Sequence, residues 1–253
     1  MISERLRKRL AGAECVVAFT GAGISAESGV PTFRSNDGIW KKFKPEELAS
    51  VNGFMRNPEL VWHWYNERRK VIRSVQPNGG HRALAALEQS VPLVTVVTQN
   101  IDNLHQRAGS TRVFELHGNI ERNYCMKCGT PLTDVESHLI DGIPHCQVER
   151  NGKVCSGLIR PDVVWFGEIL PEDEWNGAVA SMESADVVLS IGTSGVVFPA
   201  ASLPHLAKKH GAFLVEVNPE PTPLTEFADE FLNGAAGTVL PLMVDEVFSL
   251  HNK

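Results

Sequence analysis

The chain has 253 residues, a formal net charge of −6 and a hydrophobic content of 43%. This length fits one large domain, or one domain with an inserted module, and the hydrophobic content is enough for a sizeable core. The acidic balance provides no basic field for sequence-specific nucleic-acid binding or for a membrane surface, and no apolar run reaches the roughly 18 residues of a membrane span.

The N-terminal segment predicts a short helix, because Ile2, Leu6 and Leu10 are spaced four apart. Its charges leave no room for the apolar stretch of a secretory signal. Cys15 stands alone in an apolar run, where a buried thiol is expected, and the other four cysteines are clustered at metal-ligand spacing. This use of cysteine suits a reducing compartment, so we expect a cytoplasmic protein.

Apolar runs rich in Val, Ile and Leu alternate with helix-like segments along the chain. The expected strands are 14–20, 93–98, 113–116, 163–166, 186–191 and 213–217, and the expected helices include 81–88, 171–183 and 199–210. Near-continuous apolar runs indicate strands that are buried on both faces. The alternation therefore predicts an α/β fold with a doubly wound parallel sheet.

Two segments interrupt this alternation and are expected to form a smaller domain. Residues 40–75 are helix-like and rich in aromatic residues, whereas residues 122–157 contain the four clustered cysteines and no long periodic pattern. The larger domain would then consist of residues 1–39, 76–121 and 158–253.

A glycine-rich string, Gly21-Ala22-Gly23-Ile24-Ser25-Ala26, follows the first expected strand. It fits a dinucleotide-binding pattern in which Gly21 allows a tight turn, Gly23 lets the backbone approach a pyrophosphate, and Ala26 takes the third position. Such a string is also found in ordinary turns. Because no strand with an acidic end follows about 20 residues later, any dinucleotide site here is expected to be non-standard.

The four clustered cysteines form two pairs, Cys125-x2-Cys128 and Cys146-x8-Cys155. Four thiolates suit one tetrahedral Zn²⁺, and a site with four protein ligands leaves no open position for water or substrate. The pattern predicts a structural zinc site, with four unrelated thiols as the alternative.

Polar residues follow two of the expected strands. Gln99, Asn100, Ile101 and Asp102 come directly after 93–98, and His117 comes after 113–116. The carboxyl ends of parallel strands form the ligand-binding edge of an open sheet. A histidine there can exchange protons near neutral pH, although from spacing alone a structural histidine is as well supported as a catalytic one.

Two later strands end in similar polar strings. Gly192-Thr193-Ser194 follows 186–191, and Asn218-Pro219-Glu220 follows 213–217. Their hydroxyl, amide and carboxylate groups could contact a ribose, or the strings could be ordinary turns.

Together these strings resemble the sirtuins, the NAD-dependent protein deacylases. The order and spacing hold over about residues 13–245 for Gly21-Ala22-Gly23-Ile24-Ser25, Gly29-Val30-Pro31-Thr32-Phe33-Arg34, Thr98-Gln99-Asn100-Ile101-Asp102, Leu116-His117-Gly118, the four cysteines, Val164-Trp165-Phe166-Gly167-Glu168, Gly192-Thr193-Ser194 and Val217-Asn218. The departure is Ser35, where many members have glycine directly after the arginine.

The resemblance implies a Rossmann-like large domain and a small domain that combines a zinc ribbon with the helical module. NAD and an acyl-lysine would meet between them. The pyrophosphate and nicotinamide riboside would be surrounded by Ala22, Gly23, Phe33 and Arg34. The ribose and the nicotinamide pocket would be held by Gln99, Asn100 and Asp102. The adenosine half would be held by Thr193, Ser194, Asn218 and Glu220, with Ala236 near the adenine. Gly21, Ala26, Trp40, Ile101, Gly192 and Pro219 complete the expected cofactor-binding set.

The resemblance also implies the chemistry and the partner. His117 would be the general base, with Asn100 and Asp102 as further catalytic residues. Acyl-lysine proteins would be the substrates, paired as an added strand with Val164, Phe166 and Gly167. We expect a monomer.

Tyr65 and Arg68 bear on which acyl group is removed. At i and i+3 of a helix they share a face, and a phenol and a guanidinium can bind one carboxylate together. From spacing alone, a solvated arginine beside a half-buried aromatic is the simpler interpretation. The motif resembles the sirtuin subgroup that removes succinyl and malonyl groups, in which a small residue at Ala49 leaves room for a longer acyl. Removal of acetyl groups is expected as well.

Three other functions stay open at this point: mono-ADP-ribosyl transfer from the same NAD site, a non-catalytic NAD-binding scaffold, and a dehydrogenase. Intact Asn100, Asp102 and His117 argue against a scaffold. The inserted cysteine module and the lack of an acidic strand end argue against a dehydrogenase.

Overall fold

The structure is a computed structural model and describes residues 2–32, 44–133, 139–140 and 142–248. Six parallel strands form its central sheet in the order β13-β12-β11-β1-β2-β3. These strands are β1 (Cys15–Thr20), β2 (Leu93–Thr98), β3 (Val113–Glu115), β11 (Val187–Ile191), β12 (Phe213–Asn218) and β13 (Glu230–Asn233). The predicted doubly wound parallel sheet is confirmed.

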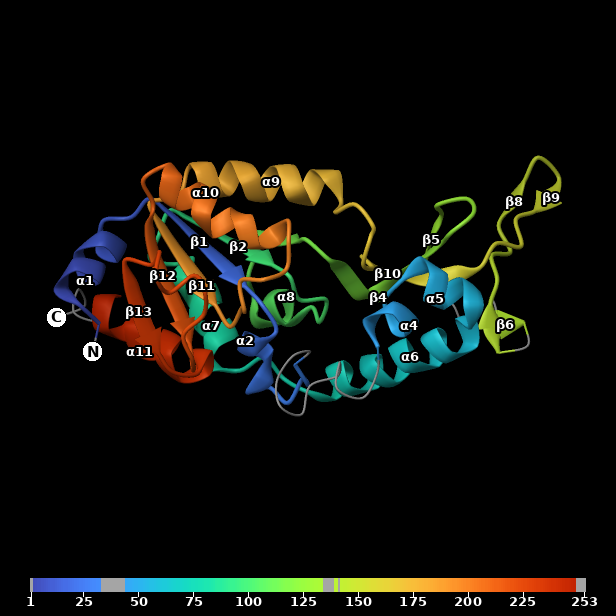
Figure 1. The fold of residues 1–253 in the computed structure, drawn as a ribbon, viewed down its shortest axis with the longest axis horizontal. Helices are drawn as coiled ribbons and strands as arrows, with labels where there is room; N and C mark the ends of the chain where they lie inside the picture. Colours follow the sequence, from blue (N-terminus) through green and yellow to red (C-terminus); the bar gives the residue numbers. More distant parts are fainter. Residues whose placement is uncertain (1, 33–43, 134–138, 141, 249–253) are drawn as a thin grey trace.

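Helices cover both faces of this sheet (Figure 1). On one face lie α1 (Glu4–Ala11), α7 (Gly79–Leu87) and α11 (Ala236–Phe248), and on the other α9 (Glu172–Glu183) and α10 (Leu203–Lys209), which follows a 3-10 turn at Ala200–Ser202. Alternate residues of one strand serve the two layers. Val16 and Ala18 pack in the first cluster, whereas Val17 and Phe19 pack in the second. Burial on both faces explains the unbroken apolar run of β1.

The chain order places a switch point in the middle of the sheet. The chain moves outward from β1 through β2 to β3, and then returns to form β11 on the other side of β1. Short helices follow two strands on the outward path: α2 (Gly23–Ala26) after β1 and α8 (Leu104–Ala108) after β2. Open α/β sheets bind ligands at the carboxyl ends of strands beside such a point.

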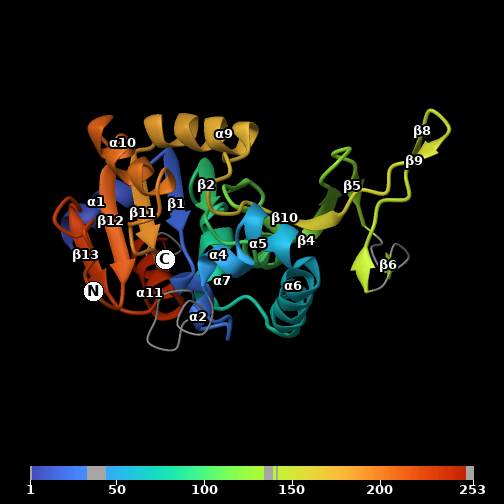
Figure 2. The ribbon, with the colours of Figure 1, turned by 45° about the vertical axis from the view of Figure 1, so that its right-hand side comes forward.

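A second, smaller unit lies beyond the β3 edge of the sheet (Figure 2). It contains α4 (Pro45–Leu48), α5 (Val51–Arg56), α6 (Pro58–Ser74) and a sheet of order β10-β4-β5, made of β10 (Ile159–Val163), β4 (Gly118–Cys125) and β5 (Pro131–Leu132). Two hairpins extend from it, β6 (Leu139–Ile140) with β7 (Ile143–Pro144) and β8 (Glu149–Arg150) with β9 (Lys153–Val154). Phe54 and Tyr65 of the helices share one core with Ile120 and Trp165.

Two differences from the sequence-based expectations concern strands and helices. The strand expected at 163–166 is displaced, because β10 ends at Val163 and the chain then turns. The elements β13 and α11 were not expected. β13 is a short edge strand, and α11 contains Pro241, which weakens a helical pattern. None of the described helices is long and apolar enough to cross a membrane.

Two buried histidines lie side by side beneath the carboxyl ends of β1 and β2. The rings of His81 and His105 are 4.9 Å apart between centroids, and neither side chain is exposed by more than 1%. His105 Nε2 lies 2.9 Å from the Thr20 hydroxyl. Burial lowers the pKa of His81 to about 4 and that of His105 well below its ordinary value.

These histidines predict a loss of stability in mild acid. Between about pH 6.5 and pH 4 the unfolded chain binds protons that the folded chain does not, so the free energy of unfolding falls as pH falls, by about 1.4 kcal/mol per pH unit for each histidine. Urea unfolding between pH 6.5 and pH 5 measures this slope. The variant His81→Gln should show a slope lower by about one proton, and an unchanged slope would contradict this origin of the acid sensitivity.

Candidate active site

A cavity of about 910 Å³ lies where the carboxyl ends of β1, β2, β11 and β12 face the second unit. Most of the residues predicted for the site line it: Gly21, Ala22, Gly23, Ala49, Tyr65, Gln99, Asn100, Ile101, His117, Val164, Phe166, Gly167, Gly192, Thr193, Ser194, Asn218, Pro219 and Glu220. Asp102, Arg68, Ala26 and Ala236 do not line it. Phe33, Arg34 and Trp40 lie outside the described residues.

The glycine loop owes its composition to close packing. A Cβ on Gly21 would lie 2.8 Å from the Gly192 carbonyl oxygen, and one on Gly23 would lie 2.7 Å from the Gly192 Cα. Gly192 itself has φ +59 and leaves no room for a Cβ against the Ile24 nitrogen. The loops after β1 and β11 can therefore pack this closely only because glycine stands at all three positions. The floor of the cavity at the switch point is consequently formed by backbone atoms without side chains.

Asn100 and Asp102 are joined by Ser25, a residue to which the sequence assigned no separate role. Asn100 Nδ2 donates to the Gly21 carbonyl at 3.0 Å and to Ser25 Oγ at 3.2 Å, and Ser25 Oγ donates to Asp102 Oδ2 at 2.6 Å. Burial raises the pKa of Asp102, although the hydrogen bonds from Ser25 and from the Leu104 N–H lower it. Asp102 thus does not line the cavity itself but is bonded to Ser25, which also accepts from Asn100. A hydroxyl within the glycine-rich string, two residues after Gly23, was the available signal.

His117 lies in the turn between β3 and β4 and lines the cavity. The next residue, Gly118, has φ +77, and a Cβ there would lie 2.2 Å from the Asp162 carbonyl oxygen, so only glycine fits. His117 Nδ1 lies 3.0 Å from the Gln99 carbonyl, which can only accept; this assigns the proton to Nδ1. Burial lowers the His117 pKa. At neutral pH Nε2 therefore carries a lone pair, as a general base requires.

Hydrogen bonds join the loops after β11 and β12 to each other and to the loop after β2. Gln99 Nε2 donates to Thr193 Oγ1 at 3.0 Å, and Asn218 Nδ2 donates to the Thr193 carbonyl at 3.0 Å. The buried Glu216 also accepts from Asn218 Nδ2, at 3.0 Å. Of the residues predicted near the cofactor, Ala26 is exposed and Ala236 is buried against Gly80 of α7.

Tyr65 lines the cavity on the side formed by α6, whereas Arg68, one turn further along the same helix, is buried but does not line it. Tyr65 is 2% exposed, and its hydroxyl accepts from Trp165 Nε1 at 2.9 Å, which leaves the phenol proton to donate elsewhere. Burial raises its pKa to about 12, so the phenol is neutral. The Arg68 guanidinium lies 5.7 Å from the centroid of the Trp64 ring, and burial lowers its pKa to about 10, so it is still charged at neutral pH.

The segment after β10 forms the opposite lip of the cavity. Its amides are already engaged, because Val164 N donates to the His117 carbonyl, Trp165 N to Glu168 Oε2 and Phe166 N to the Ala49 carbonyl. A peptide that pairs with this segment must therefore use the carbonyls and the Gly167 amide. Glu168 is in turn held by a bidentate pair with the buried Arg160, whose guanidinium stacks 3.3 Å from the Trp165 ring centroid.

The four clustered cysteines converge at the far end of β4 and β10. Their sulfur atoms all lie within 4.8 Å of one another, with Cys125 and Cys155 3.6 Å apart and Cys128 and Cys146 3.7 Å apart. These distances exclude disulfides, whose sulfurs are about 2.05 Å apart. They match the edge of about 3.8 Å of a tetrahedron with zinc–sulfur bonds of about 2.3 Å. The donor set fits one structural Zn²⁺.

Comparison with known proteins agrees with this geometry. Residues 21–199 match the Sir2 family profile. NAD-dependent protein deacylase 2 of Pyrobaculum aerophilum is 52% identical over 94% of this chain and 93% of its own length, and the NAD-dependent protein deacylase of Aquifex aeolicus is 50% identical over 91% and 94%. A solved structure of a Sir2 homologue in complex with NAD is 44% identical with a TM-score of 0.90, and the match covers 99% of this chain and 95% of that one. A structure of Sir2 bound to an acetylated peptide is 34% identical with a TM-score of 0.86, and the match covers 97% of this chain and 98% of that one. This chain belongs to the Sir2 family.

Proposed function

We propose that this protein is an NAD-dependent protein-lysine deacylase that releases nicotinamide and an O-acyl-ADP-ribose. The observation that carries the proposal is His117 in the wall of the cavity, with its proton held on Nδ1 by Gln99 and its Nε2 left basic beside the glycine floor. The names of the relatives from Pyrobaculum aerophilum and Aquifex aeolicus, at about half identity over nearly full length, support the same activity.

In the proposed reaction the acyl oxygen of the modified lysine attacks the anomeric carbon of NAD, and the bond to nicotinamide breaks. His117 then takes the proton of a ribose hydroxyl, whose oxygen attacks the carbon of the resulting alkylimidate. Addition of water and loss of the amine complete the transfer and free the lysine. General-base assistance of this kind contributes about 10²–10⁴-fold to a rate.

The residues assigned to NAD follow the loops of the sheet. For the pyrophosphate and nicotinamide riboside we propose Ala22, Gly23, Phe33 and Arg34, and for the ribose and nicotinamide pocket Gln99, Asn100 and Asp102. For the adenosine half we propose Thr193, Ser194, Asn218 and Glu220, with Ala236 at the adenine. Further contacts would come from Gly21, Ala26, Trp40, Ile101, Gly192 and Pro219. Asp102 would act through Ser25, to which it is bonded. Its buried position supports a role in orientation.

The second unit would supply the acyl-lysine side of the site. We propose that residues 40–75 and 122–157 form most of it and that a zinc ion would hold it together through four thiolates. Residues 1–39, 76–121 and 158–253 would form the NAD-binding domain, except that the parts of β4 and β10 at 118–121 and 159–163 belong to the sheet of the second unit. Val164, Phe166 and Gly167 would pair with the backbone of the substrate protein.

We further propose that acyl groups with a distal carboxylate are substrates, in addition to acetyl. Tyr65 lies on the wall with its phenol proton free to donate, because Trp165 already supplies the hydrogen bond that the oxygen accepts. Arg68 lies one turn further along α6 without itself lining the cavity, and its guanidinium is charged at neutral pH, so a carboxylate that reached it would gain a charge-assisted hydrogen bond. Ala49 is also in the wall and takes little space.

One assay tests both the activity and the acyl preference. A single peptide carrying succinyl-lysine or acetyl-lysine is incubated with the enzyme, with and without NAD. We expect NAD-dependent loss of both groups. Arg68→Met should lower desuccinylation by at least about 10-fold more than deacetylation, because a buried charge-assisted contact is worth about 1.5–3 kcal/mol.

The control for that assay is Arg73→Met, which removes an exposed arginine from the same helix, bonded to Glu121. It should leave both activities unchanged. Equal loss of both activities in Arg68→Met would contradict the carboxylate preference alone, whereas no NAD-dependent loss of either acyl group in the unmodified protein would contradict the deacylase.

A further inference from the structure

His117 lies at the point where the chain leaves one sheet for the other. Glu115 ends β3 of the six-stranded sheet, and Gly118 begins β4 of the three-stranded sheet, so only Leu116 and His117 lie between the two. Leu116 N donates to the Thr98 carbonyl on one side, and the His117 carbonyl accepts from Val164 N on the other. The position of the imidazole therefore depends on how firmly this crossing is held.

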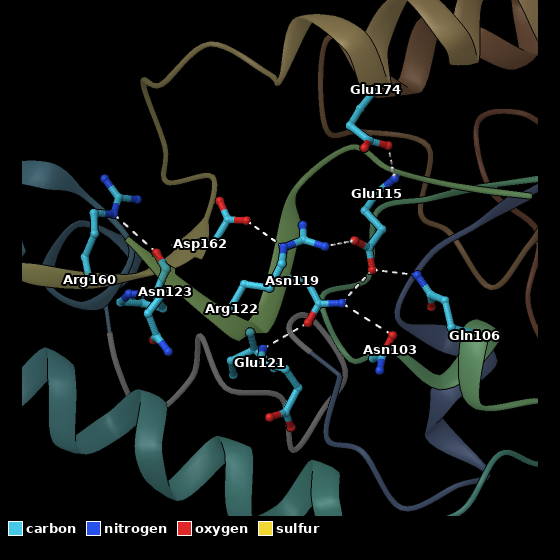
Figure 3. Close-up of polar contacts among 12 residues, drawn as sticks. Asn103, Gln106, Glu115, Asn119, Glu121, Arg122, Asn123, Arg160, Asp162 and Glu174 are labelled. Atoms are coloured by element: carbon cyan, nitrogen blue, oxygen red, sulfur yellow. Dashed lines mark hydrogen bonds and ion pairs between the residues drawn. The ribbon is translucent and has the colours of Figure 1, made fainter. Parts of the chain in front are cut away.

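Glu115 holds the crossing through both its carboxylate and its backbone N–H. The residue is 5% exposed, and its carboxylate accepts three hydrogen bonds: from Gln106 Nε2 at 2.7 Å, from Asn119 Nδ2 at 2.7 Å and from Arg122 at 2.6 Å (Figure 3). Its own N–H donates to Glu174 of α9 at 2.7 Å. One carboxylate thus ties β3 to α8 and β4, and its backbone ties it to α9.

The bond between Glu115 and Asn119 closes a bridge around His117. The two residues stand two positions before and two positions after the histidine, and both are buried. Asn119 Oδ1 accepts from the Glu121 N–H at 2.9 Å, which fixes the orientation of the amide. Arg122 extends the bridge to Asp162 of β10, at 2.8 Å, next to the segment that forms the lip of the cavity (Figure 3). The turn that carries His117 is therefore enclosed by side chains from both units.

We propose that Glu115 is a positioning residue for His117: its bridge to Asn119, Gln106 and Arg122 holds the imidazole where it can take the ribose proton. The inference rests on the proposed deacylase chemistry. Glu115 acts through geometry, since burial and the bond to Gln99 account for the charge state of His117. Misplacement of a catalytic group by about 1 Å can lower a rate by about 10²-fold.

The test compares two steps of one reaction in the variant Glu115→Gln. An amide of the same size cannot accept from Gln106, Asn119 and Arg122 together, since half of it is a donor. Nicotinamide leaves before the base acts, so exchange of labelled nicotinamide into NAD should stay within about 2-fold of the unmodified protein, while deacylation should fall about 10- to 100-fold at unchanged KM for NAD. The acid limb of the pH profile should not move.

Matched variants keep the result interpretable. Glu121→Gln makes the same chemical change on the same strand, at a carboxylate bonded to Arg73, and should leave both steps unchanged. Gln106→Ala removes one donor to Glu115 without a change of charge, and should lower deacylation in the same sense but less, even where Glu115→Gln does not fold. Double replacement of Glu115 and Asn119 should lower deacylation by less than the product of the single effects, because both act through one bridge.

The outcomes separate this inference from the proposed function. Loss of deacylation with nicotinamide exchange retained supports the positioning role. The positioning role is overturned if the folded variants lose nicotinamide exchange and deacylation to the same extent, or if they lose neither. Glu115 would then be a structural residue only. Absence of deacylation in the unmodified protein would overturn the proposed function itself.

Discussion

Replacement of His117 by alanine is expected to lower deacylation by about 10²–10⁴-fold, the usual contribution of a general base. Within the described part of the chain the side chain makes one hydrogen bond, to the Gln99 carbonyl, and it is half-buried, so the fold should be retained. Steady-state deacylation of an acetylated peptide measures the effect. NAD binding, measured separately by calorimetry, should change little, because the glycine floor and the loops after β11 and β12 are left in place.

The matched control for this experiment is His205→Ala. His205 is exposed on α10 and packs edge-on against Phe227, outside the cavity. Its loss should leave deacylation unchanged. A His117→Ala protein that deacylates at the unmodified rate would show that the base is another group or water.

The apolar strands were predictable from the sequence because burial on both faces leaves an unmistakable composition. β2 was expected at 93–98 and begins and ends there, and β1 and β11 each differ from the expected bounds by one residue. The segment around Trp165 misled the prediction, since Val163 and Trp165 face a shared core although the strand ends at Val163, and Phe166 is exposed. Apolar composition indicates burial, but it does not by itself indicate an extended backbone.

The site was predictable as far as each residue contributes its own chemistry. The cysteines and the polar strand ends could be found from spacing, and the structure brings the cysteines together and gathers most of the predicted site residues at one cavity. What the sequence could not reveal are the partners: Ser25 between Asn100 and Asp102, and Glu115 beside Asn119. These contacts join elements that are distant along the chain or depend on how a turn closes, and no local pattern encodes them.

Removal of one zinc-binding thiol is expected to have the second large effect. In Cys128→Ser the four-thiolate set is broken, and a structural zinc site in small domains contributes about 10–16 kcal/mol of binding free energy to folding. Cys125 and Cys146 pack in one cluster with Trp62 and Ile159, so loss of the metal should loosen the ends of β4 and β10. Metal analysis should fall from one zinc per chain to near zero, with a shift in tryptophan fluorescence.

Deacylation should be lost in the same variant although no cysteine lines the cavity. The start of β4 at Gly118 and the end of β10 at Val163 are paired with each other, and they flank His117 and the lip of the cavity. Loss of order at the cysteine end of these two strands would therefore also displace their other end, where His117 lies. Cys15→Ala is the control: this buried thiol in β1 is outside the cysteine cluster, and the variant should keep its zinc and its activity. Full activity in a zinc-free Cys128→Ser protein would mean that the second unit holds its geometry by packing of α4, α5 and α6 alone.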